Sequence, residues 1–364
     1  MSLILNLKKF YFDSVKVPKD FFKNNEKINY VDIGASNIKN LIFYSKFKFL
    51  NIFLFEPDQR VIKNYISSSA YNLNLIDKGL WSKKNQKFFF QFVNQPSSSF
   101  FKPNLKKLSD YKLGVDLYGL KKRILTDVDK LDNLMKKSDI DFIKLDTEGA
   151  DYEILLGAKK KLDNTLGILV ESQFFERYIS SKSFSEIEIH LRKKGFELFS
   201  MNLEKWAQTD SYNINTNIKT VWSDVLYFVS IEKFIKKLKK IKSSKSRATL
   251  VKKVIFLMVT YKLQDSSLRY LKNIRKEKMI NEENFIHIKN FILMNLRSNF
   301  SIIMIDLLRL ISIVIFLPTI IFFSEKYLDL SKYIIEKNLR NFKRLISITF
   351  KNNSIFRNKG LDIS

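Results

Sequence analysis

The segment DFIKLDTEGADYEILLGAKKKL, residues 141–162, decides the fold class of this chain. It begins with an apolar run typical of a buried strand, passes through an acidic turn with Asp146, Glu148 and Gly149, and continues with apolar residues at helical spacing. An acid, Asp151, stands in the first turn of the expected helix and lysines stand in its last turn, which complements the helix macrodipole. In open α/β sheets, ligands bind in the crevice beyond the carboxyl ends of the strands. The acidic turn is therefore a candidate functional site.

Strands and helices alternate on both sides of this segment. The predicted strands are residues 30–34, 52–56, 73–77, 142–146, 168–171, 196–201 and 225–229, and residues 88–93 form a further hairpin strand. Such alternation is typical of βαβ units, so we expect an α/β fold with a mostly parallel sheet and helices on both faces.

Glycine marks a boundary in the chain. Eight of the nine glycines lie between Gly34 and Gly195, whereas residues 231–359 contain no glycine and a single proline, Pro318. A segment without turn-forming residues favours helices. We therefore expect a helical lead-in at residues 1–27, a domain of strands and helices at 28–230, and a basic, all-helical extension at 231–364.

The composition excludes several kinds of site. The chain of 364 residues has no cysteine, which excludes disulfides, thiolate zinc sites and cysteine nucleophiles. Its two histidines, His190 and His287, are too few for a histidine-rich metal site. The first residues lack a basic start followed by a sustained apolar core, so we expect no secretory signal and a cytoplasmic location.

The net charge of +27 is concentrated in the extension, where residues 231–364 carry +18 by count. Lysine greatly outnumbers arginine, the more usual residue for recognising phosphates and bases, so we do not expect a nucleic-acid partner. An anionic membrane surface is a candidate partner for the extension, with a peripheral location at the inner face of the membrane. The alternative function is a non-catalytic protein that binds nucleic acid or a membrane surface on a Rossmann-like scaffold. The sequence does not predict the oligomeric state.

The extension contains two apolar patterns. Residues 231–241 place apolar side chains on one helical face with lysines around the rest, as in an amphipathic basic helix. Residues 310–323 are apolar apart from Ser312 and Thr319. This run is shorter than the roughly 20 residues needed to span a bilayer. Three alternatives stay open for it: a transmembrane span, an interfacial helix and a buried helix.

The acidic segment also resembles a known family. KLDTEGADYEILLGA is similar to the signature of the FkbM-type methyltransferases, which use S-adenosylmethionine to methylate hydroxyl groups, often on sugars or polyketides. Further matching blocks follow the order that the family would give them: YVDIGAS at 30–36, FLFEPD at 53–58, GLWS at 79–82, PSSSF at 96–100, ILVESQFFERY at 168–178, KKGFELFSM at 193–201 and WSDVLYFVS at 222–230. The resemblance ends near Ser230 and does not continue into the basic extension. It implies a Rossmann-like class I methyltransferase fold and a hydroxyl acceptor on a small molecule, carbohydrate, glycan or lipid-linked intermediate.

The resemblance implies a cofactor site for S-adenosylmethionine at the ends of the first three strands. At the first strand, Gly34 lets the cofactor approach, and Asp32 can accept hydrogen bonds from its ammonium group. Glu56 ends the second strand, and its separation from Gly34 in the sequence is close to that of the ribose-binding acid in dinucleotide folds. An NAD-dependent enzyme is disfavoured because no G-x-G-x-x-G turn is present. The expected cofactor-binding residues are Asp32, Gly34, Ala35, Ser36, Glu56 and Asp77.

A carboxylate is the expected general base. Methyl transfer is an in-line displacement that depends on positioning, and a hydroxyl acceptor must also lose its proton. With no suitable histidine, the candidates are Asp146, Glu148 and Glu171. Asp146 and Glu148 could hold a hard divalent cation, but no third ligand is evident, so we expect no metal.

Four residues are candidates for binding the acceptor. Ser98 and Ser99 either hydrogen-bond a polar acceptor or form turns. Trp81 and Phe174 either wall the acceptor pocket or pack within the structure. The sequence leaves both alternatives open for each residue.

Overall fold

The computed structural model of the chain describes residues 15–36, 47–66, 73–111, 114–209 and 219–296. The chain divides into two compact units, Met1–Met294 and Asn295–Ser364, and nearly all described residues belong to the first. The apolar run at residues 310–323 lies outside the described residues.

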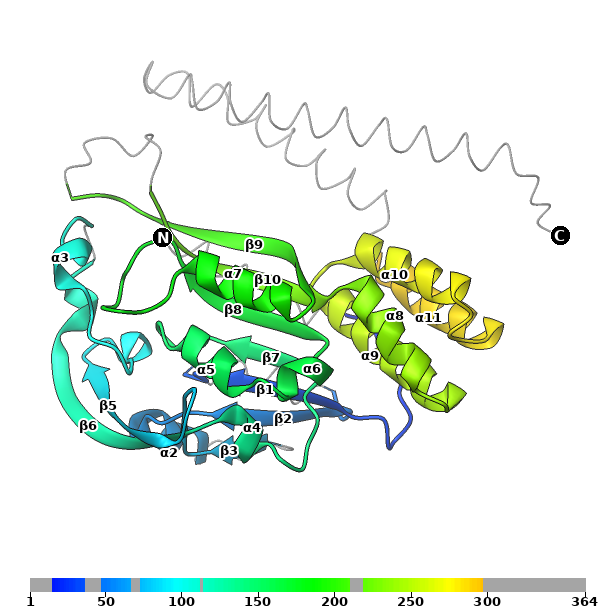
Figure 1. The fold of residues 1–364 in the computed structure, drawn as a ribbon, viewed down its shortest axis with the longest axis horizontal. Coiled ribbons are helices and arrows are strands. Elements are labelled where there is room, and N and C mark those ends of the chain that lie inside the picture. The colour runs from blue at the N-terminus through cyan, green and yellow to red at the C-terminus, as the bar shows by residue number, and fades with distance from the viewer. Residues whose placement is uncertain (1–14, 37–46, 67–72, 112–113, 210–218, 297–364) are drawn as a thin grey trace, which may run out of the picture. The chain divides into compact units, whose positions relative to one another are not determined.

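A seven-stranded sheet lies at the centre of the first unit (Figure 1). Its order is β3-β2-β1-β7-β8-β10-β9. The strands are β1 (Ile28–Ile33), β2 (Leu50–Phe55), β3 (Leu73–Ile76), β7 (Phe142–Leu145), β8 (Gly167–Gln173), β9 (Phe196–Trp206) and β10 (Lys219–Val229). Neighbours from β3 to β8 are parallel, whereas β10 is antiparallel to both β8 and β9. This sheet confirms the predicted Rossmann-like, class I methyltransferase fold.

Helices cover the sheet because its central strands are apolar on both sides. In β7, Phe142, Ile143 and Leu145 are at most 1% exposed, as expected for a strand with both faces covered. The connecting helices are α2 (Gln59–Ile66), α4 (Leu131–Leu134), α5 (Asp151–Gly157), α6 (Lys161–Asn164) and α7 (Phe184–Lys193). Of these, α5 and α7 pack against β8 and lie in front of the sheet in Figure 1.

A smaller sheet forms one side of the functional region. It joins β4 (Gly79–Leu80), β6 (Leu120–Asp129) and β5 (Asn85–Phe92) in the order β4-β6-β5. The hairpin strand predicted at residues 88–93 overlaps the second half of a longer strand, β5, which ends at Phe92. A single-turn helix, η2 (Gln95–Ser97), follows β5 and begins the serine-rich loop. Further along lie α3 (Leu105–Leu108) and η3 (Asp116–Tyr118).

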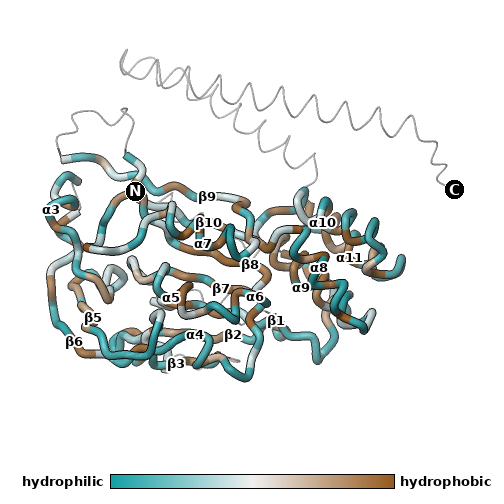
Figure 2. The backbone as a smooth tube through the Cα atoms, viewed as in Figure 1, coloured by the Kyte–Doolittle hydropathy of each residue, from teal (hydrophilic) through white to brown (hydrophobic). Residues whose placement is uncertain are grey.

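The basic segment after residue 230 begins with a helical bundle: α8 (Ile231–Lys240), α9 (Ser244–Thr260), α10 (Gln264–Lys276) and α11 (Glu282–Met294). Helix α9 is buried over most of its length, and Figure 2 shows hydrophobic residues concentrated in the strands and in α9. The bundle belongs to the same compact unit as the sheet. Among the described helices, none combines the length and apolar character that crossing a bilayer requires. The domain boundaries at residues 27 and 230 stay predictions.

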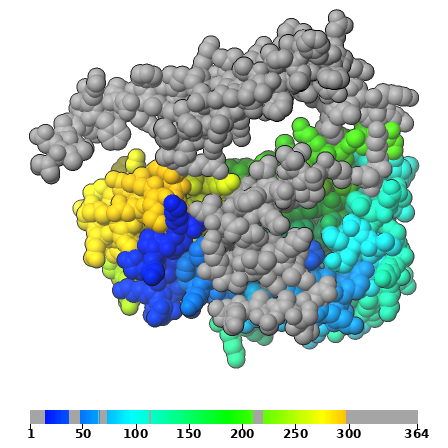
Figure 3. All heavy atoms as spheres, turned by 180° about the vertical axis from the view of Figure 1, so that it is seen from behind, coloured from blue at the N-terminus to red at the C-terminus, as the bar shows by residue number. Residues whose placement is uncertain are grey.

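The segment before β1 packs on this bundle rather than forming a helix in its described part, residues 15–27. Phe21 is fully buried and stacks on Phe291 of α11, with ring centroids 4.2 Å apart. Figure 3 shows these blue N-terminal residues beside the yellow helices. Aromatic burial therefore holds the segment in place without helical hydrogen bonds.

A buried ion pair joins the same two parts of the chain. The Lys252 ammonium in α9 binds the Glu26 carboxylate and donates to the Phe21 carbonyl oxygen at 2.9 Å. The side chains of Lys252 and Glu26 are only 8% and 6% exposed. Burial alone would raise the pKa of Glu26, but hydrogen bonds from Lys252 and Thr249 lower it below 4.5.

We predict that Glu26→Ala lowers the free energy of unfolding by roughly 3 kcal/mol, because it leaves a buried ammonium unpaired. Urea unfolding followed by circular dichroism measures this. The difference in unfolding free energy between the variant and wild type should be present above pH 4.5. It should vanish as the pH falls through the lower pKa of folded Glu26, since protonated Glu26 no longer forms an ion pair with Lys252.

The matched control is Asp163→Ala, which breaks the Asp163–Lys194 ion pair at a position where the aspartate side chain is 64% exposed. This variant should unfold nearly as wild type does. An equal effect of the two substitutions would contradict the prediction.

Candidate active site

A pocket opens at the carboxyl ends of β1, β2 and β7. Its empty volume is about 510 Å³, part of which is open to solvent. The walls come from the loops after these strands and from the serine-rich loop at residues 95–100. Of the residues predicted for the site, those that line the pocket are Gly34, Ser36, Glu56, Ser98, Asp146 and Glu148.

Gly34 allows the ends of β1 and β7 to meet. Its φ is +77°, in the left-handed region that favours glycine, and a Cβ atom there would lie 2.0 Å from the carbonyl oxygen of Asp146. The backbone N–H of Asp146 in turn donates to the Ile33 carbonyl at 3.0 Å. The expected cofactor turn and the acidic turn are therefore in backbone contact.

Lys144 links the acids of these two turns. Its ammonium lies 3.0 Å from Asp32 Oδ1 and 3.6 Å from Asp146 Oδ2. Burial alone would lower the pKa of Lys144, but the two carboxylates raise it above its ordinary value. Asp32 is buried, whereas the Asp146 side chain is 40% exposed toward the pocket. Asp146 is thus the more accessible of the paired acids.

Glu56 is a buried carboxyl group on the pocket wall at the end of β2. Its Oε1 accepts the backbone N–H of Asp58 at 2.8 Å. Burial raises the pKa of Glu56 to about 8, and the nearby charges of Asp58 and Asp32 add to the effect. Because this pKa lies above the unfolded value, the group binds more protons when folded, and its contribution lowers stability as the pH rises from 4.5 to about 8.

The acidic turn has an unusual backbone. Glu148 and Gly149 have φ values of +54° and +98°. A non-glycine residue in this region costs on the order of 1 kcal/mol and is common at functional sites. Asp151, the first residue of α5, accepts the Thr147 hydroxyl at 2.9 Å, and burial raises the pKa of Asp151 to about 7. These bonds stabilise a turn that projects Glu148 into the pocket wall.

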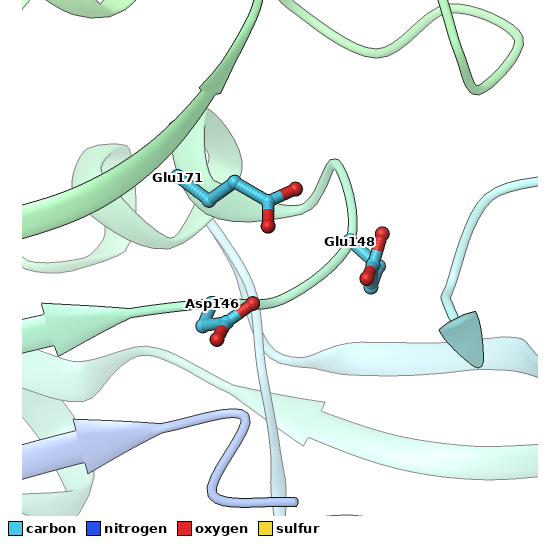
Figure 4. A group of neighbouring side chains, drawn as sticks. All are labelled: Asp146, Glu148 and Glu171. Atoms are coloured by element: carbon cyan, nitrogen blue, oxygen red, sulfur yellow. The ribbon is translucent and has the colours of Figure 1, made fainter. Parts of the chain in front are cut away.

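The three predicted catalytic acids meet beside this turn. Figure 4 shows Asp146 after β7, Glu148 in the turn and Glu171 in β8, and one oxygen from each lies within 4.8 Å of the others. Their exposure differs, because Glu171 is buried, whereas Asp146 and Glu148 are partly accessible. The sheet therefore collects acids that are separated in sequence.

Arg177 neutralises part of this acid cluster. One guanidinium nitrogen, Nη2, donates to Glu148 Oε2 and to Glu171 Oε1, the latter at 2.5 Å. The Tyr178 hydroxyl also donates to Glu148 Oε2, at 2.7 Å. Burial raises the pKa of Glu171 well above its ordinary value, although the Arg177 charge opposes the shift. Glu148 and Glu171 are thus held in place by a buried cation.

The acid cluster is compact enough to ligate a divalent cation, yet Arg177 already binds two of its three members. A dication there would lie beside a buried guanidinium, which repels it. The donor set therefore fits a resident arginine better than a metal ion.

The remaining predicted site residues lie around the pocket rather than in its wall. Ser99 donates through its hydroxyl to the Glu148 carbonyl at 2.6 Å, and the Ala35 carbonyl accepts the Tyr65 hydroxyl at 2.5 Å. Asp77 is exposed and accepts the Gln59 amide at 2.7 Å.

The two predicted aromatic residues pack against other rings. Trp81 is buried against Phe101, with ring centroids 5.3 Å apart. Phe174 packs on Phe184 at 5.6 Å. Neither belongs to the pocket lining.

Sequence patterns alone missed the cations and one acid. Lys144 and Arg177 pair with the predicted acids, and Asp224 of β10 lies opposite Glu171 in the strand register. The sequence signal that could have identified Lys144 is a charged residue inside an otherwise apolar strand, FIKL of β7. Ser98 also has a partner outside the prediction, since its hydroxyl accepts Arg60 Nη2 at 3.0 Å.

Comparison with known proteins identifies the domain. Residues 32–198 match the family described as the methyltransferase FkbM domain. No match was found among curated proteins.

Several solved methyltransferase structures are similar to the chain at low identity. The precorrin-6y C5,15-methyltransferase of Geobacter metallireducens is 10% identical, covers 61% of this chain and 88% of its own, and has a TM-score of 0.32. A SAM-dependent methyltransferase of Anabaena variabilis is 9% identical over 63% of this chain and 84% of its own, with a TM-score of 0.31. The N-terminal domain of EvdMO1, with SAH bound, is 10% identical over 56% of this chain and 74% of its own, with a TM-score of 0.29.

The family match includes both the turn after β1 and the acidic turn, and it ends within β9. It therefore covers the strands whose carboxyl ends form the pocket. Residues 32–198 thus match an FkbM methyltransferase domain, and the protein is an S-adenosylmethionine-dependent methyltransferase.

Proposed function

We propose that the protein transfers the methyl group of S-adenosylmethionine to a hydroxyl group of a carbohydrate, a glycan or a lipid-linked intermediate. The observation that carries this proposal is the accessible Asp146 carboxylate, which lies on the pocket wall beside a fixed cation, Lys144. A hydroxyl acceptor needs a base, and among the described residues the pocket lining contains carboxylates and no histidine. The non-catalytic alternative does not account for a methyltransferase domain.

The cofactor end of the pocket lies at Glu56 and Gly34. A carboxylate at the end of β2 can accept both ribose hydroxyls of a nucleoside, and Leu80, Phe89 and Ile154 supply apolar lining for a base. Asp32 lies near enough to Lys144 that its negative charge is partly balanced. When bound, the cofactor supplies an electrophilic methyl group on a sulfonium.

The chemical end of the pocket lies at the acidic turn, where Asp146 is the proposed general base. Glu148 and Glu171 are tied to Arg177, and Glu171 is also buried, so neither is as free to accept a proton from an acceptor. Ser98 lines the pocket, and its hydroxyl is within reach of a polar acceptor there. The catalytic roles are thus divided: Asp146 takes the proton, and the other two acids hold the turn.

The basic segment after residue 230 gives the proposal its second part. We propose that it holds the enzyme at an anionic membrane surface, where each nearby lysine adds about 1 kcal/mol of binding free energy. This arrangement would bring the enzyme close to acceptors carried by lipids.

The acceptor class is tested by measuring SAH formation with a panel of free monosaccharides, sugar nucleotides and a polyprenyl-linked saccharide, with unmodified tRNA as a nitrogen acceptor. We expect turnover with at least one hydroxylated sugar and none with tRNA. Turnover with tRNA alone, with the methyl group on a base nitrogen rather than on a ribose 2′-hydroxyl, would contradict the hydroxyl acceptor while leaving the methyltransferase assignment intact.

Glu56→Gln should weaken SAH binding about 100-fold, because two hydrogen bonds to a charged acceptor are worth roughly 1.5 kcal/mol or more each. Isothermal titration calorimetry measures the affinity. Glu176→Gln, at a surface acid paired with Lys107 and outside the pocket lining, is the matched control and should bind as wild type does. If Glu56→Gln binds SAH normally, Glu56 does not hold the ribose.

SAH affinity should also depend on pH through Glu56. Its pKa in the free protein is about 8, so below pH 8 the carboxyl must lose a proton before it can accept two hydroxyl hydrogen bonds. We expect affinity to rise about tenfold per pH unit from pH 6 to 8 and to level off above. The dependence should disappear in Glu56→Gln, and a flat profile in the wild type would argue against an ionised Glu56.

Asp146→Asn should reduce turnover by a factor of about 100 to 10,000 through loss of the base, with little change in SAH affinity. Turnover is followed by SAH formation with the best acceptor of the panel. Glu148→Gln is the informative comparison, because it removes a neighbouring charge that is already paired with Arg177. If Glu148→Gln loses turnover and Asp146→Asn keeps it, the base is Glu148.

A further inference from the structure

A second pocket lies between α10 and α11, far along the chain from the methyltransferase site. We call it the α10–α11 groove. Its empty volume is about 880 Å³, part of it open to solvent. The floor is apolar and consists of Leu268, Leu271 and Phe285. The groove is large enough for a lipid headgroup with part of its chain.

Four basic residues and no acid complete the described lining: Lys272, Arg275, Lys276 and Lys289. Arg275 is occupied, because it pairs with Glu282 at 3.0 Å and lies over the Phe285 ring at 4.3 Å. Among the residues that the structure describes, no carboxylate lies within ion-pair distance of the other three. The groove therefore presents three lysine ammonium groups above an apolar floor.

An exposed apolar strip continues the groove along α11. Ile286 and Leu293 are 49% and 42% exposed. They lie three residues before and four residues after Lys289, which places all three on one face of the helix. Lysines beside exposed aliphatic residues are typical of helices that lie in a membrane interface.

We infer that the α10–α11 groove docks the protein on an anionic lipid bilayer. The lysines contact headgroup phosphates, and Ile286 and Leu293 enter the boundary of the acyl region. Nucleic acid fits less well, because the one aromatic ring of the described groove is buried beneath Arg275 and cannot stack on a base. The inference rests on the membrane part of the proposed function and is independent of the methyl acceptor.

Docking through this groove leaves the methyltransferase pocket free. Helix α8 follows β10, whose last residues pair with the first residues of β8. The bundle therefore leaves the sheet at the amino ends of its parallel strands, opposite the edge where the pocket opens. Figure 1 shows α10 and α11 at the other end of the sheet from β5 and α5.

The test is flotation of the full chain with vesicles that mix phosphatidylcholine, the major component, with anionic phosphatidylglycerol. The triple variant Lys272→Gln, Lys276→Gln and Lys289→Gln should bind about 100-fold more weakly than wild type, at about fivefold for each lysine. The control variant Lys83→Gln, Lys84→Gln and Lys137→Gln removes the same charge at exposed positions outside the groove and should bind within threefold of wild type. SAH binding by all three proteins checks that they are folded.

Several results would overturn the inference. An equal loss in both triple variants would show that only total charge matters, and equal wild-type binding to pure phosphatidylcholine would remove the anionic requirement. If wild type does not bind vesicles at all, the membrane part of the proposed function fails with it. SAH formation with sugar acceptors, measured separately, would then still report on methyl transfer.

Discussion

At the middle of the sheet, Gly34 passes so close to the carbonyl oxygen of Asp146 that a Cβ atom would lie 2.0 Å from it. This approach is open only to a residue that has no side chain and tolerates a φ of +77°. It brings the turn after β1 against the turn after β7, although the two are far apart in sequence. The pocket depends on this contact, because both turns contribute to its wall.

Once the turns meet, the site must tolerate several acids in a small space. Two cations make this possible: Lys144 pairs with Asp32 and Asp146, and Arg177 pairs with Glu148 and Glu171. Buried carboxylates without such partners would be neutralised by protonation. Burial raises the pKa of Glu56, which has no ion-pair partner among the described residues, to about 8, and it also raises the pKa of Glu171 although Arg177 pairs with it. Burial thus acts on both carboxyl groups, and the Arg177 charge opposes its effect on Glu171.

The helices after residue 230 are joined to the sheet by packing rather than by a linker. Tyr261, just after α9, stacks on Phe142 of β7 with ring centroids 5.0 Å apart, and Phe142 stacks on Tyr30 of β1 at 5.1 Å. This stack lies at the amino ends of the two strands, opposite the pocket. The bundle therefore supports the strands that carry the site and, through α10 and α11, presents a basic groove on its outer side.

Local signals in the sequence predict the seven strands of the large sheet, because apolar periodicity and turn residues act over short stretches of chain, but they do not predict β4 and β6 of the small sheet. Together with the family resemblance, they place Gly34, Glu56, Asp146 and Glu148 at the candidate site, since all four lie in the turns after parallel strands that end at one edge. The roles of Lys144 and Arg177 could not be derived, because their partners come from distant strands. The sequence also could not decide whether Trp81 and Phe174 line the pocket or pack inside the protein, since an aromatic side chain suits both positions. Only the folded chain shows which acids are paired and which acid faces the pocket. It also shows that α10 and α11 form a groove. The reason is that burial and ion pairing depend on distances between segments that the local sequence does not contain.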